Sequence, residues 1–415
     1  METRGAKHNE LQKIIDACME VNGYKPRYAK HHLEDSTYKI HQSRVCIVDN
    51  KIVSYLRISE RQMHIGRSIV KVGGIGHVWT LEKYRHKGYS TAVLRDTNKY
   101  MLAEGYDLGL LFTAIQPFYA RLDWASFKHT SFKMDLSPLK RFEPNDWIVR
   151  SYQIKDLPQI IELYHIHNKT RTGTIVRIPN QWSDGYGLST GLQPTVVVEK
   201  DGMIAAYANL GLGEDPELSN VNDSFLSGYY PNIREIAYNP KYKDALIALA
   251  HGILIRAQKA GLKTITGHLP RHDPMTLLLS QESGNPLSFT SSETSMFRIV
   301  SLYSLLSKLV PEFEGRLQKA QLTSTTASYV IQVENQSCTL QIHDNRINIL
   351  EGRLGTTSVN LNTYLFIKLL FGDSTFAELT EYNSVLGLKL SDKDTSILNV
   401  LFPKGEYIHW ICDYY

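Results

Sequence analysis

The 415-residue chain is poor in cysteine, and none of its four cysteines forms a CxxC pair. Cys18, Cys46, Cys338 and Cys412 are scattered along the chain. This distribution argues against a disulfide framework and against a zinc site. We therefore expect no bound metal and a reducing, cytoplasmic setting.

The sequence also lacks a long apolar run. No stretch approaches the roughly 18 consecutive apolar residues that a transmembrane helix needs. The N-terminal residues 1–7 are followed by polar residues rather than by the apolar core of a signal peptide. Neither a membrane span nor a membrane partner is expected.

Charge of one sign is not concentrated either. The net charge is only +4, with 21% charged and 42% hydrophobic residues, which is a globular profile. Residues 83–87 form a short basic cluster, but the long basic stripe of a nucleic-acid binder is missing. The length favours two or three domains.

Helix and strand patterns alternate in the first segment, residues 1–145. The patterns predict a helix at 9–21, strands at 44–48, 52–56, 68–73, 76–81 and 108–113, and a helix at 90–104 that Gly105 ends.

A similar order follows in the second segment, residues 146–295, with a helix at 160–167, a strand–turn–strand at 195–207, a strand at 233–238 and a helix at 245–260. The recurrence at a spacing of about 150 residues indicates a weak internal duplication. The third segment, 296–415, predicts helices at 302–309 and 362–371 and strands at 328–333, 338–343 and 346–350.

The chemically informative part is a strand that enters a basic, glycine-bearing loop, which then opens a helix. Backbone N–H groups at a helix N-terminus have no intrahelical partners and bind phosphate oxygens. Gly88 lets the backbone approach a ligand closely, and Arg85 and Lys87 add positive charge. This pattern predicts a pyrophosphate site.

Two other phosphate-binding motifs do not match this stretch. The sequence contains no GxxxxGK[ST] loop. Gly74-Ile75-Gly76 lacks the third glycine of GxGxxG, because Trp79 stands there. We interpret this triplet as a bend before a strand, and His77 and His86 as structural or solvent-facing rather than as bases.

The hexapeptide Arg85-His86-Lys87-Gly88-Tyr89-Ser90 resembles the pyrophosphate loop of the GNAT acetyltransferase superfamily, Arg/Gln-x-x-Gly-x-Gly/Ala. Ser90 departs from the last position but is also small. The resemblance implies acetyl-coenzyme A as co-substrate, with the preceding strand pairing with pantetheine amides. It implies these cofactor-binding residues: Val78, Trp79, Thr80, Arg85, His86, Lys87, Gly88, Tyr89, Ser90, Thr91, Ala114 and Ile115.

Two further stretches carry a resemblance. Residues 116–124 are similar to the GNAT stretch in which a tyrosine, here Tyr119, lies beside the cofactor sulfur. The aromatic C-terminus 407–415, after two GNAT-like segments and a small α+β segment, resembles the enhanced-intracellular-survival (Eis) family. In that family the terminal carboxylate enters the first domain's active site, and a third domain resembles a sterol carrier protein.

The resemblance implies an α+β fold with tandem GNAT-like domains. These are an N-terminal acetyltransferase domain (1–145), a degenerate GNAT-like domain (146–295) and a sterol-carrier-protein-like domain (296–415). Residues 236–245 have no glycine at the needed place, so one cofactor site per chain is expected. A homo-oligomer, a hexamer by resemblance, is expected as well.

Acetyl transfer to an amine requires a base, because an ammonium ion has no lone pair. The resemblance assigns this role to the Tyr415 α-carboxylate. Tyr119 would protonate the leaving thiolate, and Thr80 or a nearby backbone N–H would polarise the thioester carbonyl. Glu34, Asp35, Asp123 and Asp413 are candidates to line an anionic substrate cavity, although each alone reads as a surface charge.

These residues predict an N-acetyltransferase acting on a primary amine, such as an aminoglycoside-like compound, another polyamine or a lysine of a peptide or protein. The alternative is a lipid carrier in which the third segment binds the lipid and the GNAT halves are scaffold. A more remote alternative is an aminoacyl or acyl transferase on a similar tandem scaffold.

Overall fold

The computed structural model describes residues 1–23, 37–136, 146–182, 196–211, 232–322, 324–381 and 389–414. Packing divides the chain into two units. The first comprises Met1–Lys30, Thr37–Phe127 and Glu293–Tyr407, and the second comprises His31–Ser36, Lys128–Ser292 and Ile408–Tyr415. The two units group residues by packing and do not test where the three predicted domains begin and end. The domains 1–145, 146–295 and 296–415 therefore stay a prediction.

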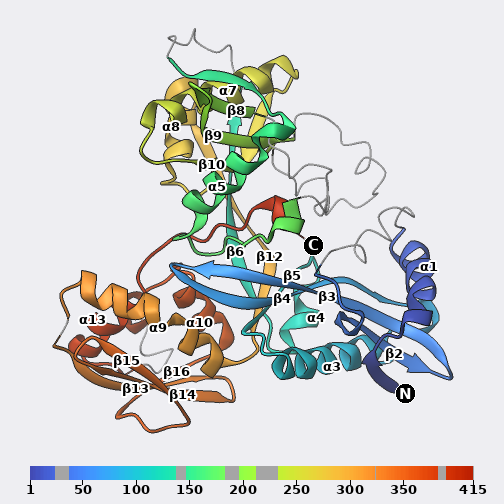
Figure 1. The fold of residues 1–415 in the computed structure, drawn as a ribbon. Coiled ribbons are helices and arrows are strands. Elements are labelled where there is room, and N and C mark those ends of the chain that lie inside the picture. Colours follow the sequence, from blue (N-terminus) through green and yellow to red (C-terminus); the bar gives the residue numbers. More distant parts are fainter. Residues whose placement is uncertain are drawn as a thin grey trace. The chain divides into compact units, whose positions relative to one another are not determined.

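The N-terminal part of the first unit is a mixed sheet with strand order β1-β2-β3-β4-β5-β12 (Figure 1). Its strands are β1 (Glu2–Gly5), β2 (Ser43–Val48), β3 (Lys51–Ile65), β4 (Ser68–Thr80), β5 (Leu108–Phe112) and β12 (Leu287–Ile299). Only β4 and β5 pair in parallel, and the helix that connects them is α3 (Tyr89–Ala103). Among the described residues of this part, the other helices are α1 (Leu11–Asn22), the short α4 (Gln116–Ala120) and the 3-10 turns η1 (His8–Glu10), η2 (Ile40–Gln42) and η3 (Glu82–Tyr84).

Helix α3 packs on this sheet through one apolar stripe. Val93, Leu94 and Met101 are buried at helical spacing. A Cβ on Gly73 would lie 2.5 Å from the Met101 sulfur. Gly73 therefore allows close helix–sheet packing. β4 is one strand where the sequence predicts two, at 68–73 and 76–81. A register irregularity follows directly after residues 74–76, which we interpreted as a bend before a strand.

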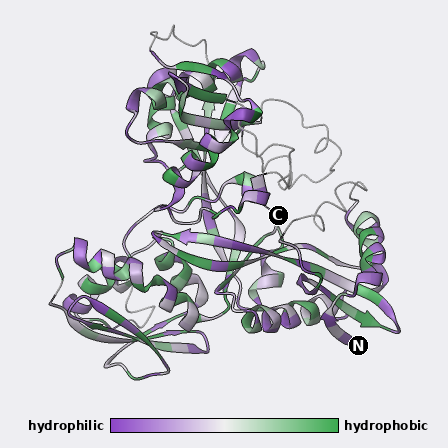
Figure 2. Ribbon diagram, in the orientation of Figure 1, coloured by the Kyte–Doolittle hydropathy of each residue, from purple (hydrophilic) through white to green (hydrophobic). Residues whose placement is uncertain are grey.

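The second unit repeats this topology in the order β6-β11-β10-β9-β8-β7. Its strands are β6 (Ala125–Asp135), β7 (Ile148–Ser151), β8 (Val196–Lys200), β9 (Met203–Leu210), β10 (Ile233–Tyr238) and β11 (Thr264–Gly267). The parallel pair β10–β11 is connected by α7 (Lys243–Lys259), as β4–β5 is by α3. Where this unit is described, its remaining helices are α5 (Leu157–Asn168), α8 (Pro274–Ser283) and the 3-10 turns η4 (Ile154–Asp156), η5 (Pro179–Trp182) and η6 (Ile411–Asp413). Hydrophobic colouring predominates on the strands of this unit, which form one large core with α5 and α7 (Figure 2).

Two strands depart from simple sequence order. β12 follows α8 along the chain but pairs with β5 of the first unit through Ser295–Ile299. β6 follows α4 but pairs with β11 of the second unit. Each of the two strand orders is thus completed by a strand from the other half of the sequence.

The third segment forms a four-stranded sheet, β15-β14-β13-β16, within the first unit. The strands are β13 (Thr326–Val333), β14 (Gln336–His343), β15 (Arg346–Glu351) and β16 (Thr357–Leu361), with helices α9 (Leu302–Lys319), α10 (Thr363–Leu370), α11 (Phe376–Glu381) and α13 (Asp392–Leu401). The predicted end of α9 at residue 309 is wrong: the helix continues through Pro311, because Phe313 and Leu317 extend its buried stripe. The likeness to a sterol carrier protein stays a prediction.

Asp107 connects this segment to β5. Its carboxylate is fully buried and accepts from Lys308 Nζ and Ser304 Oγ, both at 2.6 Å. It also accepts from the Lys71 N–H at 2.6 Å. One carboxylate therefore joins β4, β5 and α9.

None of the helices in the described ranges combines the length and apolarity that a bilayer crossing requires.

Candidate active site

β4 separates from β5 just before the predicted cofactor strand. The parallel pairing runs from Val72–Leu108 to Ile75–Leu111. On the other side of β4, Tyr55 opposes Trp79 whereas Arg57 opposes Gly76, and His77 has a positive φ of 52°. This is a β-bulge, which bends a strand locally. The pairing with β5 thus ends before Val78–Thr80.

The side chains at this end of β4 contact different partners. Trp79 is 3% exposed, stacks on Tyr55 with ring centroids 5.5 Å apart, and donates from Nε1 to Cys18 Sγ at 3.2 Å. The Thr80 hydroxyl lies 2.8 Å from Ser54 Oγ. Trp79 can therefore serve a ligand only through its backbone, while its indole holds the strand against α1.

The predicted phosphate loop reaches α3 through Gly88. Gly88 is the N-cap, with φ 81° in the left-handed region, and the first intrahelical bond runs from the Ala92 N–H to the Gly88 carbonyl at 3.0 Å. The N–H groups of residues 89–91 therefore have no acceptor within the helix. Together with the helix dipole, they form a site for an anion.

The cations of the loop are exposed and loosely held. Arg85 Nε donates to the Thr80 carbonyl at 3.3 Å, and Lys87 Nζ lies 5.5 Å from the Tyr84 ring centroid. His86 is exposed with φ 61°. A Cβ at Gly88 would meet no atom within 4 Å. The loop thus combines positive charge, donor groups and open space, which fits a pyrophosphate.

Tyr119 lies on α4 and is 6% exposed. Its ring contacts Phe118 and Trp124 edge-on, with centroids 4.9 and 6.5 Å away. Burial raises the pKa of the Tyr119 hydroxyl to about 12. The phenol therefore keeps its proton at neutral pH and can act as a proton donor.

The structure brings several predicted residues to one hydrophobic cluster. Tyr119 belongs to it, and Val78 and Tyr89 pack against it. Ala114 and Ile115 are exposed in the connection from β5 to α4, where the Ile115 N–H donates to Thr113 Oγ1 at 3.0 Å. The strand end, the helix start and the tyrosine thus pack on the same hydrophobic core.

The candidate carboxylates are not gathered in the described residues. Asp123 accepts from Arg298 Nη1 at 2.8 Å and has φ 61°. Asp413 belongs to the second unit and accepts from Arg177 Nε at 2.6 Å. Both side chains already have a guanidinium partner, which gives each a structural role. Glu34, Asp35 and Tyr415 lie outside the described residues.

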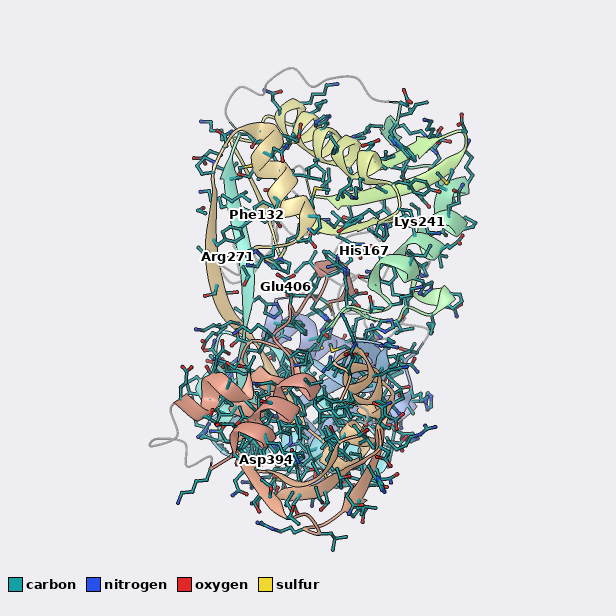
Figure 3. All side chains as sticks on the ribbon, turned by 90° about the vertical axis from the view of Figure 1, so that its left-hand side faces the viewer. Phe132, His167, Lys241, Arg271, Asp394 and Glu406 are labelled. Atoms are coloured by element: carbon teal, nitrogen blue, oxygen red, sulfur yellow. The ribbon has the colours of Figure 1, made fainter. Side chains whose placement is uncertain are left out.

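The segment before Tyr415, Ile408–Tyr414, is firmly packed in the second unit. Entry of the terminal carboxylate into the first domain's active site stays a prediction. Trp410, Ile411 and Tyr414 are 2–4% exposed. Trp410 stacks on His167 with ring centroids 6.4 Å apart and donates from Nε1 to Asn168 Oδ1 at 3.0 Å. Figure 3 labels His167, which belongs to α5. This segment, the tail, is therefore anchored by apolar area and by hydrogen bonds.

Sequence reasoning missed the β4 bulge and the buried partners of the tail. The local signal that could have indicated it is Gly76, directly before His77, because an isolated glycine in a strand often marks a bulge. Arg177 and Glu235 meet Asp413 across 236 and 178 positions of sequence, and nothing local in the sequence points to that contact.

Residues 2–127 match the model of the acetyltransferase (GNAT) domain family. This part of the chain is a GNAT acetyltransferase domain. No curated protein matches the chain.

Several solved structures share the fold over the whole chain. A GCN5-related N-acetyltransferase from Anabaena variabilis ATCC 29413 is 14% identical, with a TM-score of 0.71 and 98% of each chain covered. A conserved Enterococcus faecalis V583 protein, described as a probable N-acyltransferase, is 14% identical with a TM-score of 0.73, covering 100% of this chain and 99% of its own. Eis1 from Mycobacterium abscessus is 13% identical with a TM-score of 0.64 and 98% of each chain covered. The shared architecture is a mixed α+β, GNAT-like fold.

Proposed function

We propose that this protein is an acetyl-coenzyme-A-dependent N-acetyltransferase of the Eis type. It transfers the acetyl group to a primary amine, such as an aminoglycoside-like compound, another polyamine or a lysine side chain. The observation that carries the proposal is the Gly88 loop at the start of α3, which shares a hydrophobic cluster with the buried Tyr119. The family match and the shared fold support the reaction class.

The reaction is a direct transfer. The amine nitrogen attacks the thioester carbonyl carbon, the new C–N bond forms, and the C–S bond breaks. The Tyr415 α-carboxylate accepts the proton that the amine loses. Tyr119 donates a proton to the departing sulfur, because burial keeps its hydroxyl protonated.

The cofactor is held by the loop and strand that the sequence assigns to it. The N–H groups of residues 89–91 and the side chains of Arg85 and Lys87 bind the pyrophosphate. The backbone of Val78–Thr80 binds the pantetheine arm. Acetyl-coenzyme A supplies the activated acetyl group when bound.

We further propose one cofactor site per chain. In the second unit, α7 begins after Tyr242 with φ −114°, and that ring packs on Trp147 at 5.6 Å. An aromatic residue thus stands where the first unit has Gly88. A phosphate would meet a side chain there instead of open backbone.

Calorimetry and an amine panel test the proposal. We expect acetyl-coenzyme A to bind once per chain. We expect thiol release to rise above the hydrolysis rate with at least one amine class among aminoglycosides, polyamines and lysine peptides. A protein that binds no coenzyme A would sink the proposal. A lipid that copurifies with a protein lacking coenzyme A affinity would support the lipid-carrier alternative instead, which no observation favours now.

A further inference from the structure

The start of β3 lies beside the chain that leads from β4 to α3. The Leu81 N–H donates to the Val53 carbonyl at 3.0 Å, so the backbone contact with β3 continues beyond the paired residues of the two strands. Lys51 is the first residue of β3 and directly follows the tight turn at residues 49–50, which both have positive φ. A lysine from another part of the sequence is thereby brought toward η3 and the Gly88 loop.

Two ammonium groups lie over one aromatic ring at this place. Lys51 Nζ is 5.9 Å and Lys87 Nζ is 5.5 Å from the centroid of the Tyr84 ring. The Tyr84 ring in turn lies 6.1 Å from the ring of Tyr89, the first residue of α3. The attraction of a cation to a ring face therefore holds both ammonium groups close to the start of the helix.

The positive charge around this ring is not neutralised by carboxylates. The cations in or next to η3 and the loop are Lys51, Lys83, Arg85 and Lys87. Within the described ranges none of them forms an ion pair, whereas Lys71 of β4 pairs with Glu60 at 3.3 Å. Because neighbouring like charges repel one another, this surface favours a ligand with several negative charges.

Coenzyme A carries more negative charge than its pyrophosphate alone. Its ribose also bears a 3′-phosphate, and such a monoester has a charge of roughly −1.5 to −2 at neutral pH. The proposed function assigns the N–H groups of residues 89–91 and the side chains of Arg85 and Lys87 to the pyrophosphate. Lys51 is the cation beside Lys87 that this assignment leaves unused.

We propose that Lys51 binds the 3′-phosphate of coenzyme A and makes the site specific for the complete cofactor over its 3′-dephospho form. This inference rests on the proposed function, in which the Gly88 loop holds the pyrophosphate. The Tyr84 ring holds the Lys51 ammonium beside Lys87, and one ribose joins the two phosphate positions. Lys51 acts on affinity and leaves the chemical step unchanged.

Calorimetry of coenzyme A and of 3′-dephospho-coenzyme A tests the proposal. We expect the parent to bind coenzyme A about tenfold more tightly, the lower end of what a hydrogen bond between charged groups contributes. K51M should bind both compounds with about the affinity that the parent has for the dephospho form. K51R should keep the preference, because a guanidinium also pairs with a phosphate.

Two other lysines provide matched controls. Lys99 is exposed on α3, and K99M removes the same charge from the same domain. It should keep the parental preference. K87M should weaken the binding of both compounds by a similar factor, because both contain the pyrophosphate. Lys51 and Lys99 are exposed, so we expect parental Tm values for K51M and K99M.

The outcomes separate this inference from the proposed function. A parent that binds the two compounds equally, or a K51M protein that keeps the preference, would overturn the inference alone. A K51M protein that loses affinity for both compounds equally would assign Lys51 to the pyrophosphate and overturn it as well. Loss of the preference in K99M would show that the effect is one of overall charge and not of contact. A parent that binds neither compound would refute the proposed function and this inference with it.

Discussion

Burial decides which protons the side chains of this protein can give or take. Tyr119 is nearly inaccessible, and its pKa of about 12 makes it a donor rather than a base. We predict that Tyr119→Phe lowers kcat by about 10²–10⁴-fold, the usual contribution of a general acid, with little change in coenzyme A affinity. Steady-state kinetics and calorimetry check this. Tyr100→Phe on α3 is the control, and a Tyr119→Phe rate within a few-fold of the parent would mean that Tyr119 only packs.

Buried histidines make the second unit sensitive to acid. Burial holds the pKa values of His129 and His167 well below 6.5 and lowers that of His268 to about 4. At these three histidines, the unfolded chain binds more protons than the folded chain below pH 6.5. Stability is therefore complete above that pH and is lost as the pH falls toward 4, by about 1.4 kcal/mol per unit of pKa depression.

We predict that Tm falls as the pH is lowered from 7.5 to 4.5, and that His129→Leu reduces the slope. Calorimetric scans at several pH values measure both. His343→Leu is the control, because the side chain of His343 is 76% exposed. An unchanged slope in His129→Leu would show that His129 is not among the groups that cause the acid sensitivity.

At the scale of elements, α3 has a glycine near each end, so a substitution at one glycine is the control for the same substitution at the other. Gly88 at its start and Gly105 just beyond its end have φ values of 81° and 70°, and neither would meet an atom within 4 Å of an added Cβ. Valine costs about 1–2 kcal/mol of left-handed strain at either position. Only at Gly88 would it also block the donors of residues 89–91.

We therefore predict that Gly88→Val and Gly105→Val lose similar stability, and that only Gly88→Val loses coenzyme A binding. Thermal melts and calorimetry of acetyl-coenzyme A measure the two effects. Equal affinities in the two folded variants would remove the phosphate site from the start of α3.

Local patterns in the sequence predict most elements but not their partners. The strands at β13, β14 and β15 and the helices α3 and α7 lie within a few residues of the predicted ranges, because periodicity and C-terminal glycines are local signals. The pairing of β12 with β5 and of β6 with β11 is long-range. No window of sequence contains that information.

The residues of the candidate site also divide into those that the local sequence predicts and those whose contacts are long-range. The residues of the Gly88 loop are consecutive in sequence, and so are those around Tyr119. In the structure, residues of both stretches pack in one hydrophobic cluster. The β4 bulge depends on register against β3, and the partners of Asp123 and Asp413 come from distant strands and loops. From their charge alone, these aspartates were candidates to line a substrate cavity. In the structure, each carboxylate already pairs with an arginine.

At the scale of the whole molecule, acetyl transfer as proposed depends on the position of the Tyr415 carboxylate. Appending three glycines keeps every side chain of the tail and moves the carboxylate by up to about 10 Å. Because Trp410, Ile411 and Tyr414 still dock, we predict unchanged Tm and coenzyme A affinity but a fall in kcat of about 10²–10⁴-fold. The control is insertion of the same glycines at the β14–β15 turn, between Asp344 and Asn345, which should leave kcat unchanged. If the extended protein acetylates amines at the parental rate, the terminal carboxylate is not the base, and the search moves to side-chain carboxylates such as Glu34 and Asp35.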